Sequence, residues 1–157
     1  MNNNIPKTIL ITGATSGFGK ATAKLFNEKG WQTIITGRRA DRLEELAKEL
    51  GEKSLPLAFD ISDRRAVKSA IQNISPNFNN ISVLCNNAGL ALGLEGADNA
   101  NLDDWDQMID TNIKGIVYTT RNILPLMIEN GEGHIINLGS VAGSYPYPGG
   151  NVYGGTK

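Results

Sequence analysis

The sequence predicts an α/β fold, a doubly wound parallel sheet with helices on both faces. Short apolar runs of strand length alternate with stretches in which apolar residues recur at helical spacing. A cluster of glycines separates the first apolar run from the first helical stretch. The resulting order, β-α-β-α-β-α-β-α-β, favours parallel strands that are joined by right-handed crossovers.

The composition is that of an ordinary globular domain. The 157 residues are 40% hydrophobic and 20% charged, enough for one domain with a sizeable core. The net charge of −1 gives no reason to expect a nucleic-acid or membrane partner, and no apolar stretch approaches the roughly 20 residues that span a bilayer. One cysteine and one histidine provide neither an internal disulfide nor a structural zinc site, so we expect no metal. The polar opening, residues 1–7, lacks the apolar run of a secretory signal, and we expect a reducing, cytoplasmic location.

The first half of the chain contains two strands and two helices. Thr8–Thr12 is β-branched and almost uninterrupted in its apolar character, which predicts a buried strand. After the glycines, a helix runs to Gly30, a residue that commonly stops helices. Thr33–Thr36 is the second strand, and the second helix begins near Asp41, with leucines on one face, and ends at Gly51.

The second half continues the alternation. Leu55–Phe59 is the third strand, Asp63 to about Ile74 the third helix and Ile81–Cys85 the fourth strand. A long helix is predicted from Leu102 to Glu129. Pro125 should kink it or end its regular part, because proline lacks an N–H and its ring clashes with the preceding turn.

The last predicted elements are a fifth strand, His134–Leu138, and a helix that begins near Asn151. No internal linker, repeat or low-complexity segment interrupts the chain. We therefore expect residues 1–157 to form a single domain.

Three glycines, Gly13, Gly17 and Gly19, stand between the first strand and the first helix. Glycine permits unusual backbone angles and leaves no Cβ between a ligand and the peptide N–H groups. The helix directs its free N–H groups and positive dipole end at the same place, which suits a pyrophosphate. The spacing G-x-x-x-G-x-G differs from the commoner G-x-G-x-x-G, and a tight turn without a ligand would also use glycine. The position directly after a strand favours nucleotide binding.

The end of the second strand carries Arg38 and Arg39 where an NAD-binding protein has a carboxylate. Two guanidinium groups could bind the 2′-phosphate of NADP, and we prefer this to a merely solvated basic pair. Asp60, after the third strand, could accept a hydrogen bond from the adenine amino group. It could equally cap the next helix, beside Ser62 and Asp63.

The fourth strand ends in Asn86, Asn87, Ala88 and Gly89. In a parallel sheet the ligand lies across the carboxyl ends of the strands, and small residues there let the backbone approach it. The two asparagine side chains could also bridge neighbouring strands, as their main, structural role.

Asn112 falls inside the apolar stripe of the long helix. A buried amide without hydrogen bonds costs roughly 1–3 kcal/mol, so we expect a specific partner for it. One interpretation is an amide that holds a water at a helix bend, and another is that this water belongs to a proton path. The two are compatible.

Ser140 follows the fifth strand, at the predicted ligand edge. A hydrolase nucleophile elbow needs glycines two positions before and after the serine, where this chain has Leu138 and Ala142. The only histidine, His134, lies at the opposite end of the same strand. A Ser-His-acid triad therefore has no base within this chain.

Tyr153 and Lys157 are four residues apart and fall on one helix face. A phenol titrates near 10 when unperturbed, and a nearby ammonium favours the phenolate. A tyrosine so placed can donate a proton to a carbonyl oxygen or remove one from an alcohol, while Ser140 binds the same oxygen. Alone, Tyr-x-x-x-Lys is common by chance.

Together these motifs resemble the short-chain dehydrogenase/reductase family: Thr12-Gly13-x-x-x-Gly17-x-Gly19, Asn86-Asn87-Ala88-Gly89, Asn112, Ser140 and Tyr153-x-x-x-Lys157. The resemblance covers essentially the whole chain. It implies a Rossmann-like fold with strand order 3-2-1-4-5, and catalysis by Asn112, Ser140, Tyr153 and Lys157. It also implies NADP contacts from Gly13, Thr15, Ser16, Gly17, Phe18, Gly19, Arg38, Arg39, Asp60, Ile61, Asn87, Ala88, Gly89, Tyr153 and Lys157.

Three sequence segments most resemble the branch of NADP-dependent 3-hydroxy acid dehydrogenases: "TGRR", "NNAGLALG" and "GSVAGSYPYPGGNVYGGTK". That branch implies a small substrate such as serine, allo-threonine or malonic semialdehyde. A sugar, steroid or oxoacyl reductase of the same family, or a non-catalytic NADP-sensing regulator, remain the alternatives. Since family members are longer, the resemblance also implies missing C-terminal strands, a homotetrameric full-length protein, and a 157-residue chain that is poorly active and prone to associate.

Overall fold

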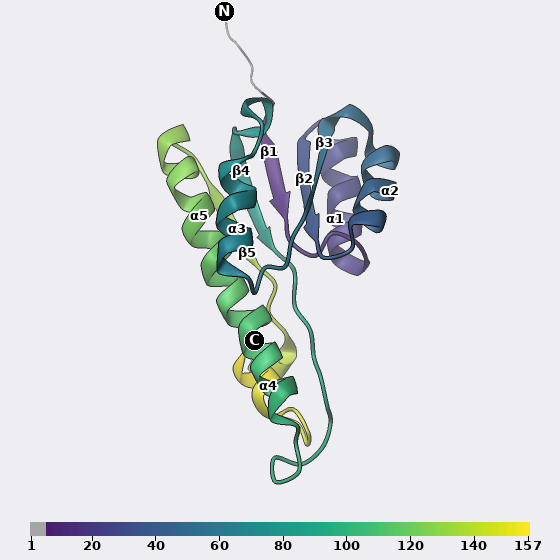
Figure 1. Ribbon diagram of the computed structural model, residues 1–157, viewed down its shortest axis with the longest axis vertical. Coiled ribbons are helices and arrows are strands. Elements are labelled where there is room, and N and C mark those ends of the chain that lie inside the picture. Colours follow the sequence, from purple (N-terminus) through teal and green to yellow (C-terminus); the bar gives the residue numbers. More distant parts are fainter. Residues whose placement is uncertain (1–5) are drawn as a thin grey trace, which may run out of the picture.

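Five parallel strands form one sheet in the order β3-β2-β1-β4-β5, which confirms the predicted fold class (Figure 1). The strands are β1 (Thr8–Ile11), β2 (Gln32–Gly37), β3 (Ser54–Ala58), β4 (Ile81–Asn86) and β5 (His134–Asn137). The computed structural model describes residues 6–157, so most of the polar opening segment, residues 1–5, lies outside the described residues.

The helices occupy the predicted places between the strands. They are α1 (Gly17–Glu28), α2 (Ala40–Leu50), α3 (Arg64–Gln72), α4 (Leu102–Ile109), α5 (Gly115–Asn130) and α6 (Asn151–Gly155). Short 3₁₀ turns cover Gly51–Lys53, Pro76–Phe78 and Val141–Gly143.

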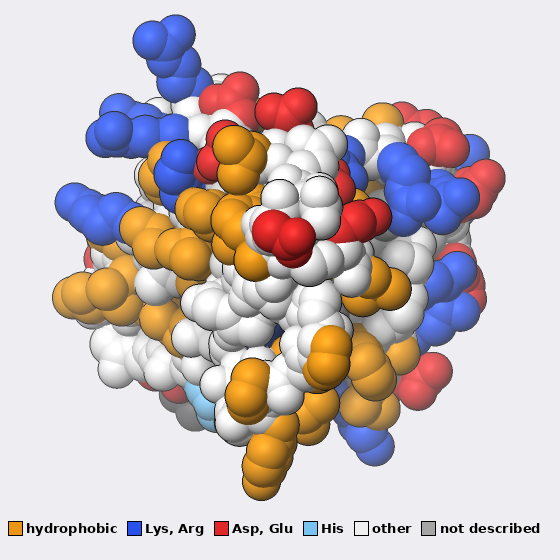
Figure 2. Space-filling view, turned by 90° about the horizontal axis from the view of Figure 1, so that it is seen from below, with side chains coloured by type: hydrophobic (Ala, Val, Ile, Leu, Met, Phe, Trp, Pro, Cys, Tyr) orange, Lys and Arg blue, Asp and Glu red, His pale blue; other side chains and the backbone are white. Residues whose placement is uncertain are grey.

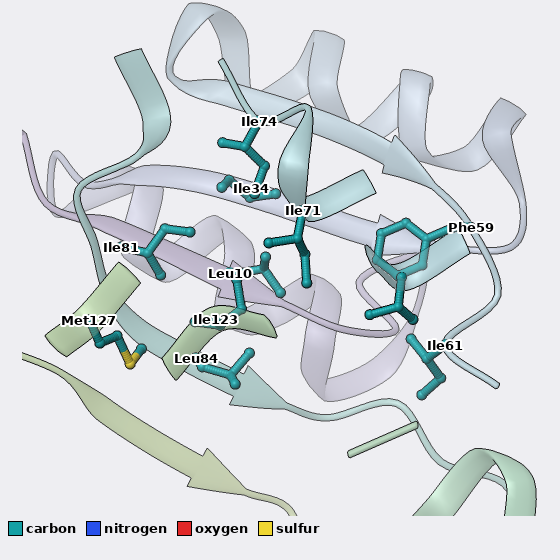
Figure 3. Close-up of a cluster of buried hydrophobic side chains, with 11 residues drawn as sticks. Leu10, Ile34, Phe59, Ile61, Ile71, Ile74, Ile81, Leu84, Ile123 and Met127 are labelled. Carbon is teal, nitrogen blue, oxygen red and sulfur yellow. The ribbon is translucent and has the colours of Figure 1, made fainter. Parts of the chain in front are cut away.

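Two hydrophobic clusters, one on each side of the sheet, form the core. Successive residues of a strand point to opposite faces, so Ile9 and Ile11 join one cluster and Leu10 the other. The first cluster includes Leu43 of α2, together with side chains of α1. The second packs α3 and α5 against the sheet, as Figure 3 shows for Ile123 and its neighbours. Burial on both faces explains the uninterrupted apolar sequence of β1.

The predicted long helix is divided near its middle. A π-helical turn, Asp110–Lys114, joins α4 to α5. Pro125 lies inside α5, which continues to Asn130, so the prediction that this proline could end the regular helix is wrong. Buried Ile123 and Met127 anchor the helix on both sides of the proline. Their packing offsets one missing backbone hydrogen bond, because tertiary contacts supply most helical stability in proteins.

Candidate functional site

A cleft of about 740 Å³ opens at the carboxyl ends of the strands. This volume is within the range of small-molecule sites. The cleft is lined by fourteen of the predicted site residues: Gly13, Thr15, Ser16, Phe18, Arg38, Arg39, Asp60, Ile61, Asn87, Ala88, Gly89, Ser140, Tyr153 and Lys157. Residues far apart in the sequence therefore meet at one place, as expected for the carboxyl edge of a parallel sheet.

Three predicted residues, Gly17, Gly19 and Asn112, are not among the lining residues of the cleft. Seven further residues line the cleft that were not predicted as site residues: Gly37, Phe59, Leu90, Ala91, Thr111, Leu138 and Gly139. Six of them stand at or shortly after the end of a strand, so the rule that ligands lie at strand ends would have identified them: Gly37 ends β2, Phe59 follows β3, Leu90 and Ala91 come after β4, and Leu138 and Gly139 follow β5. Thr111 lies within the π-helical turn, and no sequence signal marked it.

The glycine-rich loop is shaped by backbone geometry and close packing. Gly13 and Gly17 adopt positive φ angles of 68° and 53°, which side-chain-bearing residues rarely adopt. An added Cβ on Gly13 would lie 2.9 Å from Ala88 Cα, and one on Gly19 would lie 2.5 Å from Gly13 O. Gly13 and Gly19 thus allow the loop to pack against the segment after β4. Ser16 stands at the N-cap position of α1, beside the helix N–H groups.

Thr12 joins this loop to the segment after β4. Its Oγ1 accepts hydrogen bonds from the backbone N–H groups of Asn87 at 3.1 Å and Ala88 at 3.0 Å, and donates to Cys85 O. In return, Asn87 Nδ2 donates to Thr12 O at 2.8 Å and Gly13 O at 3.1 Å. These reciprocal bonds fix two walls of the cleft relative to each other.

Asn86 bridges to the next strand and to α5. Its Nδ2 donates to Asn137 Oδ1 at 2.8 Å and to Thr120 Oγ1 at 3.1 Å. The strand-bridging role considered for both asparagines is therefore present in the structure. For Asn87 it coexists with a place in the cleft wall.

The basic end of the cleft lies after β2. Arg39 Nη2 donates to Thr15 Oγ1 at 2.7 Å, and Arg38 Nη1 lies 3.8 Å from Asp60 Oδ2. Arg38 and Arg39 both line the cleft, and their reading of a 2′-phosphate stays a prediction. The arrangement holds two positive charges at one end of the cavity.

Asp60 and Asp63 have separate roles. The carboxylate of Asp63 caps α3, accepting from the N–H groups of Arg65 at 2.8 Å and Ala66 at 3.0 Å. The bonds from Ala66 and then Arg65 hold the pKa of Asp63 below its ordinary value. The interpretation of Asp60 as the helix cap is therefore wrong. Asp60 Oδ1 instead accepts from the N–H and hydroxyl of Ser62, and the carboxylate lines the cleft.

Asn112 lies in the π-helical turn and is only 1% exposed. Its Oδ1 accepts from Leu90 N at 2.9 Å, and its Nδ2 donates to Leu90 O at 2.8 Å and to Thr156 Oγ1 at 2.9 Å. The expected specific partners of this amide are thus the backbone N–H and C=O of Leu90 in the cleft wall and the hydroxyl of Thr156. Thr156 was not considered as a partner from the sequence. Whether Asn112 also serves a proton path stays a prediction.

Ser140, Tyr153 and Lys157 all line the cleft, and Ser140 follows β5, the strand at the opposite edge of the sheet from β3. Ser140 Oγ accepts from Ala142 N at 3.2 Å, and a hydroxyl that accepts there can still donate its own proton. Lys157 Nζ donates to Leu138 O at 3.0 Å, which leaves further ammonium donors. His134 begins β5, and Ser140 follows its far end, which agrees with the exclusion of a hydrolase triad.

The cleft wall beside Lys157 depends on Gly89. An added Cβ on Gly89 would lie 2.9 Å from Lys157 Nζ and 3.3 Å from Asn112 Oδ1. The missing side chain therefore leaves room for the ammonium of Lys157 and the amide of Asn112 beside Gly89. Along residues 6–157, no helix is both long enough and apolar enough to cross a membrane.

Comparisons with known proteins agree with this geometry. A family model described as short chain dehydrogenase matches residues 7–157. The NADP-dependent 3-hydroxy acid dehydrogenase YdfG of Salmonella typhi is 53% identical over 149 residues, covering 95% of this chain and 60% of that protein. The serine 3-dehydrogenase of Rhizobium radiobacter is 56% identical over 150 residues, covering 96% of this chain and 60% of that protein.

A solved structure described as the closed form of serine dehydrogenase complexed with NADP+ is similarly close. It superposes with a TM-score of 0.93 at 51% identity, covering 96% of this chain and 60% of that one. The chain thus spans about 60% of the length of the curated relatives it matches. The predicted resemblance is confirmed over almost every residue given, and the chain belongs to the short chain dehydrogenase family.

Proposed function

We propose that this chain is a single NAD(P)-binding domain of an NADP-dependent oxidoreductase. The reaction is hydride transfer between NADP(H) and a small 3-hydroxy acid or the matching carbonyl compound, such as serine, allo-threonine or malonic semialdehyde. The observation that carries this proposal is one cleft lined by Arg38 and Arg39, which follow β2, and by Ser140, Tyr153 and Lys157, of which Ser140 follows β5. The names of the relatives, which include NADP, 3-hydroxy acids and serine, support it.

The strand order sets the direction of the cleft. Arg38 and Arg39 follow β2 and Ser140 follows β5, with β1 and β4 between them. An elongated dinucleotide is complementary to such a cleft, with its phosphorylated ribose at the basic end and its nicotinamide at the other. The glycine loop after β1, at the N-terminus of α1, suits the pyrophosphate between them.

The proposed chemistry is divided among three side chains. When bound, NADP accepts or supplies the hydride. The phenol of Tyr153 removes the alcohol proton in oxidation and returns it in reduction. The hydroxyl of Ser140 holds the substrate oxygen, and the ammonium of Lys157 binds the cofactor ribose.

A spectrophotometric assay tests this proposal. The purified protein and NADP+ are mixed with serine, allo-threonine, 3-hydroxybutyrate or a simple secondary alcohol, and NADPH is followed at 340 nm. We expect turnover with the hydroxy acids above that with plain alcohols. Turnover only with sugar, steroid or oxoacyl substrates would favour another branch of the family. NADP+ binding without any turnover would favour a sensor.

We further propose self-association through α5 and a cytoplasmic location. Val117, Leu124 and Ile128 lie on one face of α5 with 56%, 39% and 70% of their surface exposed. Such a helical apolar stripe is suited to packing against another copy of the chain, as in a homotetramer of the whole protein. Figure 2 shows groups of exposed hydrophobic side chains on the face of the molecule seen from below. The buried free thiol of Cys85 suits a reducing compartment, which cell fractionation would test.

A further inference from the structure

We propose that Thr156 is a positioning residue for this reaction. Its hydroxyl couples Asn112 to the short helix that carries Tyr153, and thereby holds Tyr153 and Lys157 at the cleft. The inference deepens the proposed function and rests on it for its kinetic readout.

The helix α6 needs such an anchor. It spans only Asn151–Gly155 and includes two glycines. A helix this short is unfavourable by itself, and glycine is among the least favourable residues within a helix. Its position must therefore come from contacts with the rest of the protein.

Thr156 supplies a directed pair of hydrogen bonds at the end of this helix. Its Oγ1 donates to Tyr153 O at 2.8 Å and accepts from Asn112 Nδ2 at 2.9 Å. A hydroxyl has one proton, so donation to the carbonyl leaves a lone pair for the amide N–H. Thr156 is 9% exposed and Asn112 1%, so water does not readily replace either partner.

The orientation of the Asn112 amide is set by the backbone of Leu90. Leu90 N donates to Oδ1 and Leu90 O accepts from Nδ2, at 2.9 Å and 2.8 Å. A reversed amide would place oxygen against oxygen and N–H against N–H, so the second N–H must face Thr156. Asn112 thus joins the cleft wall after β4 to α6 through the threonine hydroxyl.

Removing the hydroxyl would leave the second N–H of Asn112 without a partner. It would also take one of two hydrogen bonds from the carbonyl of Tyr153, which accepts from Thr156 N at 3.0 Å as well. The residue that follows Thr156 is Lys157, whose ammonium is held by Leu138 O at 3.0 Å. A shift of α6 would therefore move the proposed proton donor and the proposed ribose ligand together. A displacement of about 1 Å in such a site can cost about 100-fold in rate.

The test compares Thr156→Val, which keeps the shape and loses the hydroxyl, with Thr156→Ser, which keeps the hydroxyl. Thr119→Val is the matched control. Thr119 is a buried threonine of α5, whose Oγ1 donates to Gly115 O at 2.8 Å without contact to the cleft. For each variant, kcat and KM with a 3-hydroxy acid, the dissociation constant of NADP+ and the unfolding temperature are measured.

We expect Thr156→Val to lower kcat by about 10- to 100-fold and to weaken NADP+ binding several-fold, because misplaced catalytic groups lose rate steeply. Thr156→Ser should restore kcat and the NADP+ dissociation constant to within about threefold of the wild-type values. Thr119→Val should lower only the unfolding temperature. A Thr156→Val protein whose kinetics and NADP+ affinity match those of Thr119→Val would overturn the proposal.

The outcomes also separate this inference from the proposed function. If the wild type binds NADP+ but oxidises none of the hydroxy acids, the proposed function fails and the NADP+ affinities of the variants decide the role of Thr156. If the wild type does not bind NADP+, both are overturned.

Discussion

The two arginines after β2 are held in different ways. Arg39 donates to the neutral hydroxyl of Thr15 at 2.7 Å, whereas Arg38 lies 3.8 Å from the carboxylate of Asp60. A carboxylate neighbour partly compensates the charge of Arg38, although both groups are exposed and salt screens the interaction. Both remain able to bind an anion in the cleft, through guanidinium N–H groups that match phosphate oxygens.

The first prediction concerns cofactor preference. Arg38→Ala should weaken NADP+ binding by about 10- to 100-fold, because a hydrogen bond to a charged group contributes about 1.5–3 kcal/mol. Binding of NAD+, which lacks the 2′-phosphate, should change little. The two dissociation constants are measured by fluorescence titration at one fixed ionic strength. Arg42→Ala, at an exposed position of α2, is the control. Equal losses for both cofactors would mean that Arg38 does not read the 2′-phosphate.

Individual site residues differed in how readily the sequence revealed them. Gly13 was recognisable because a tight turn directly after a strand favours glycine. The structure gives Gly13 a positive φ and a close neighbour in Ala88. Thr156 was not, because a threonine beside a lysine carries no pattern of its own. Its role depends on Asn112, which is 44 residues away in sequence and reaches it only through the fold.

At the scale of elements, the link between β1 and β4 shows how the cleft walls are joined. Thr12 is 1% exposed, and its hydroxyl serves two backbone N–H groups and one carbonyl. Thr33, on β2, is fully buried, and its Oγ1 has no hydrogen-bond partner within residues 6–157. The two threonines therefore form a natural pair for comparison.

The second prediction follows from that pair. Thr12→Val should lower the free energy of unfolding by about 1–3 kcal/mol, because the N–H of Ala88 loses its acceptor and that of Asn87 keeps only Cys85 O. Thr12→Ser should recover most of this loss. Thr33→Val should be neutral or stabilising, since it replaces an unpaired buried hydroxyl with a methyl group. Urea unfolding measures all three, and equal effects of Thr12→Val and Thr33→Val would contradict this account of the Thr12 hydroxyl.

Element boundaries were predictable where a local signal existed. Glycines and short β-branched runs fixed most strands to within a few residues, as for β4, predicted at Ile81–Cys85 and found at Ile81–Asn86. The division of the long helix was not predictable, because no residue pattern in Asp110–Lys114 distinguishes a π-helical turn from an α-helical one. The π-helical turn accompanies the bonds that Asn112 makes to Leu90 and Thr156, which no local pattern encodes.

At the scale of the whole molecule, the order of strands and helices was sufficient to predict a parallel sheet. Right-handed crossovers leave few topologies for alternating strands and helices. The family resemblance then supplied the order β3-β2-β1-β4-β5, which the structure confirms. Association between copies was predicted from that resemblance, and the exposed apolar face of α5 now gives it a physical basis.

The third prediction concerns this face. The wild-type chain should sediment as an oligomer at micromolar concentration, because apolar side chains such as Ile128 lie exposed along α5. Val117→Glu and Ile128→Glu, combined, should shift the distribution toward the monomer. Leu25→Glu, at a half-exposed position of α1, serves as the control and should not. Sedimentation velocity provides the measurement, and a wild-type monomer at every concentration would rule out this interface.

The central claim is that the phenol of Tyr153 transfers the proton that accompanies hydride transfer at this cleft. The most direct measurement compares NADPH formation from a 3-hydroxy acid by the wild type and by Tyr153→Phe, with NADP+ affinity titrated in parallel. Loss of the proton-transferring group should lower turnover by at least about 100-fold, while NADP+ affinity stays within a few-fold of the wild type. A Tyr153→Phe protein that turns over at the wild-type rate with intact NADP+ binding would contradict the account.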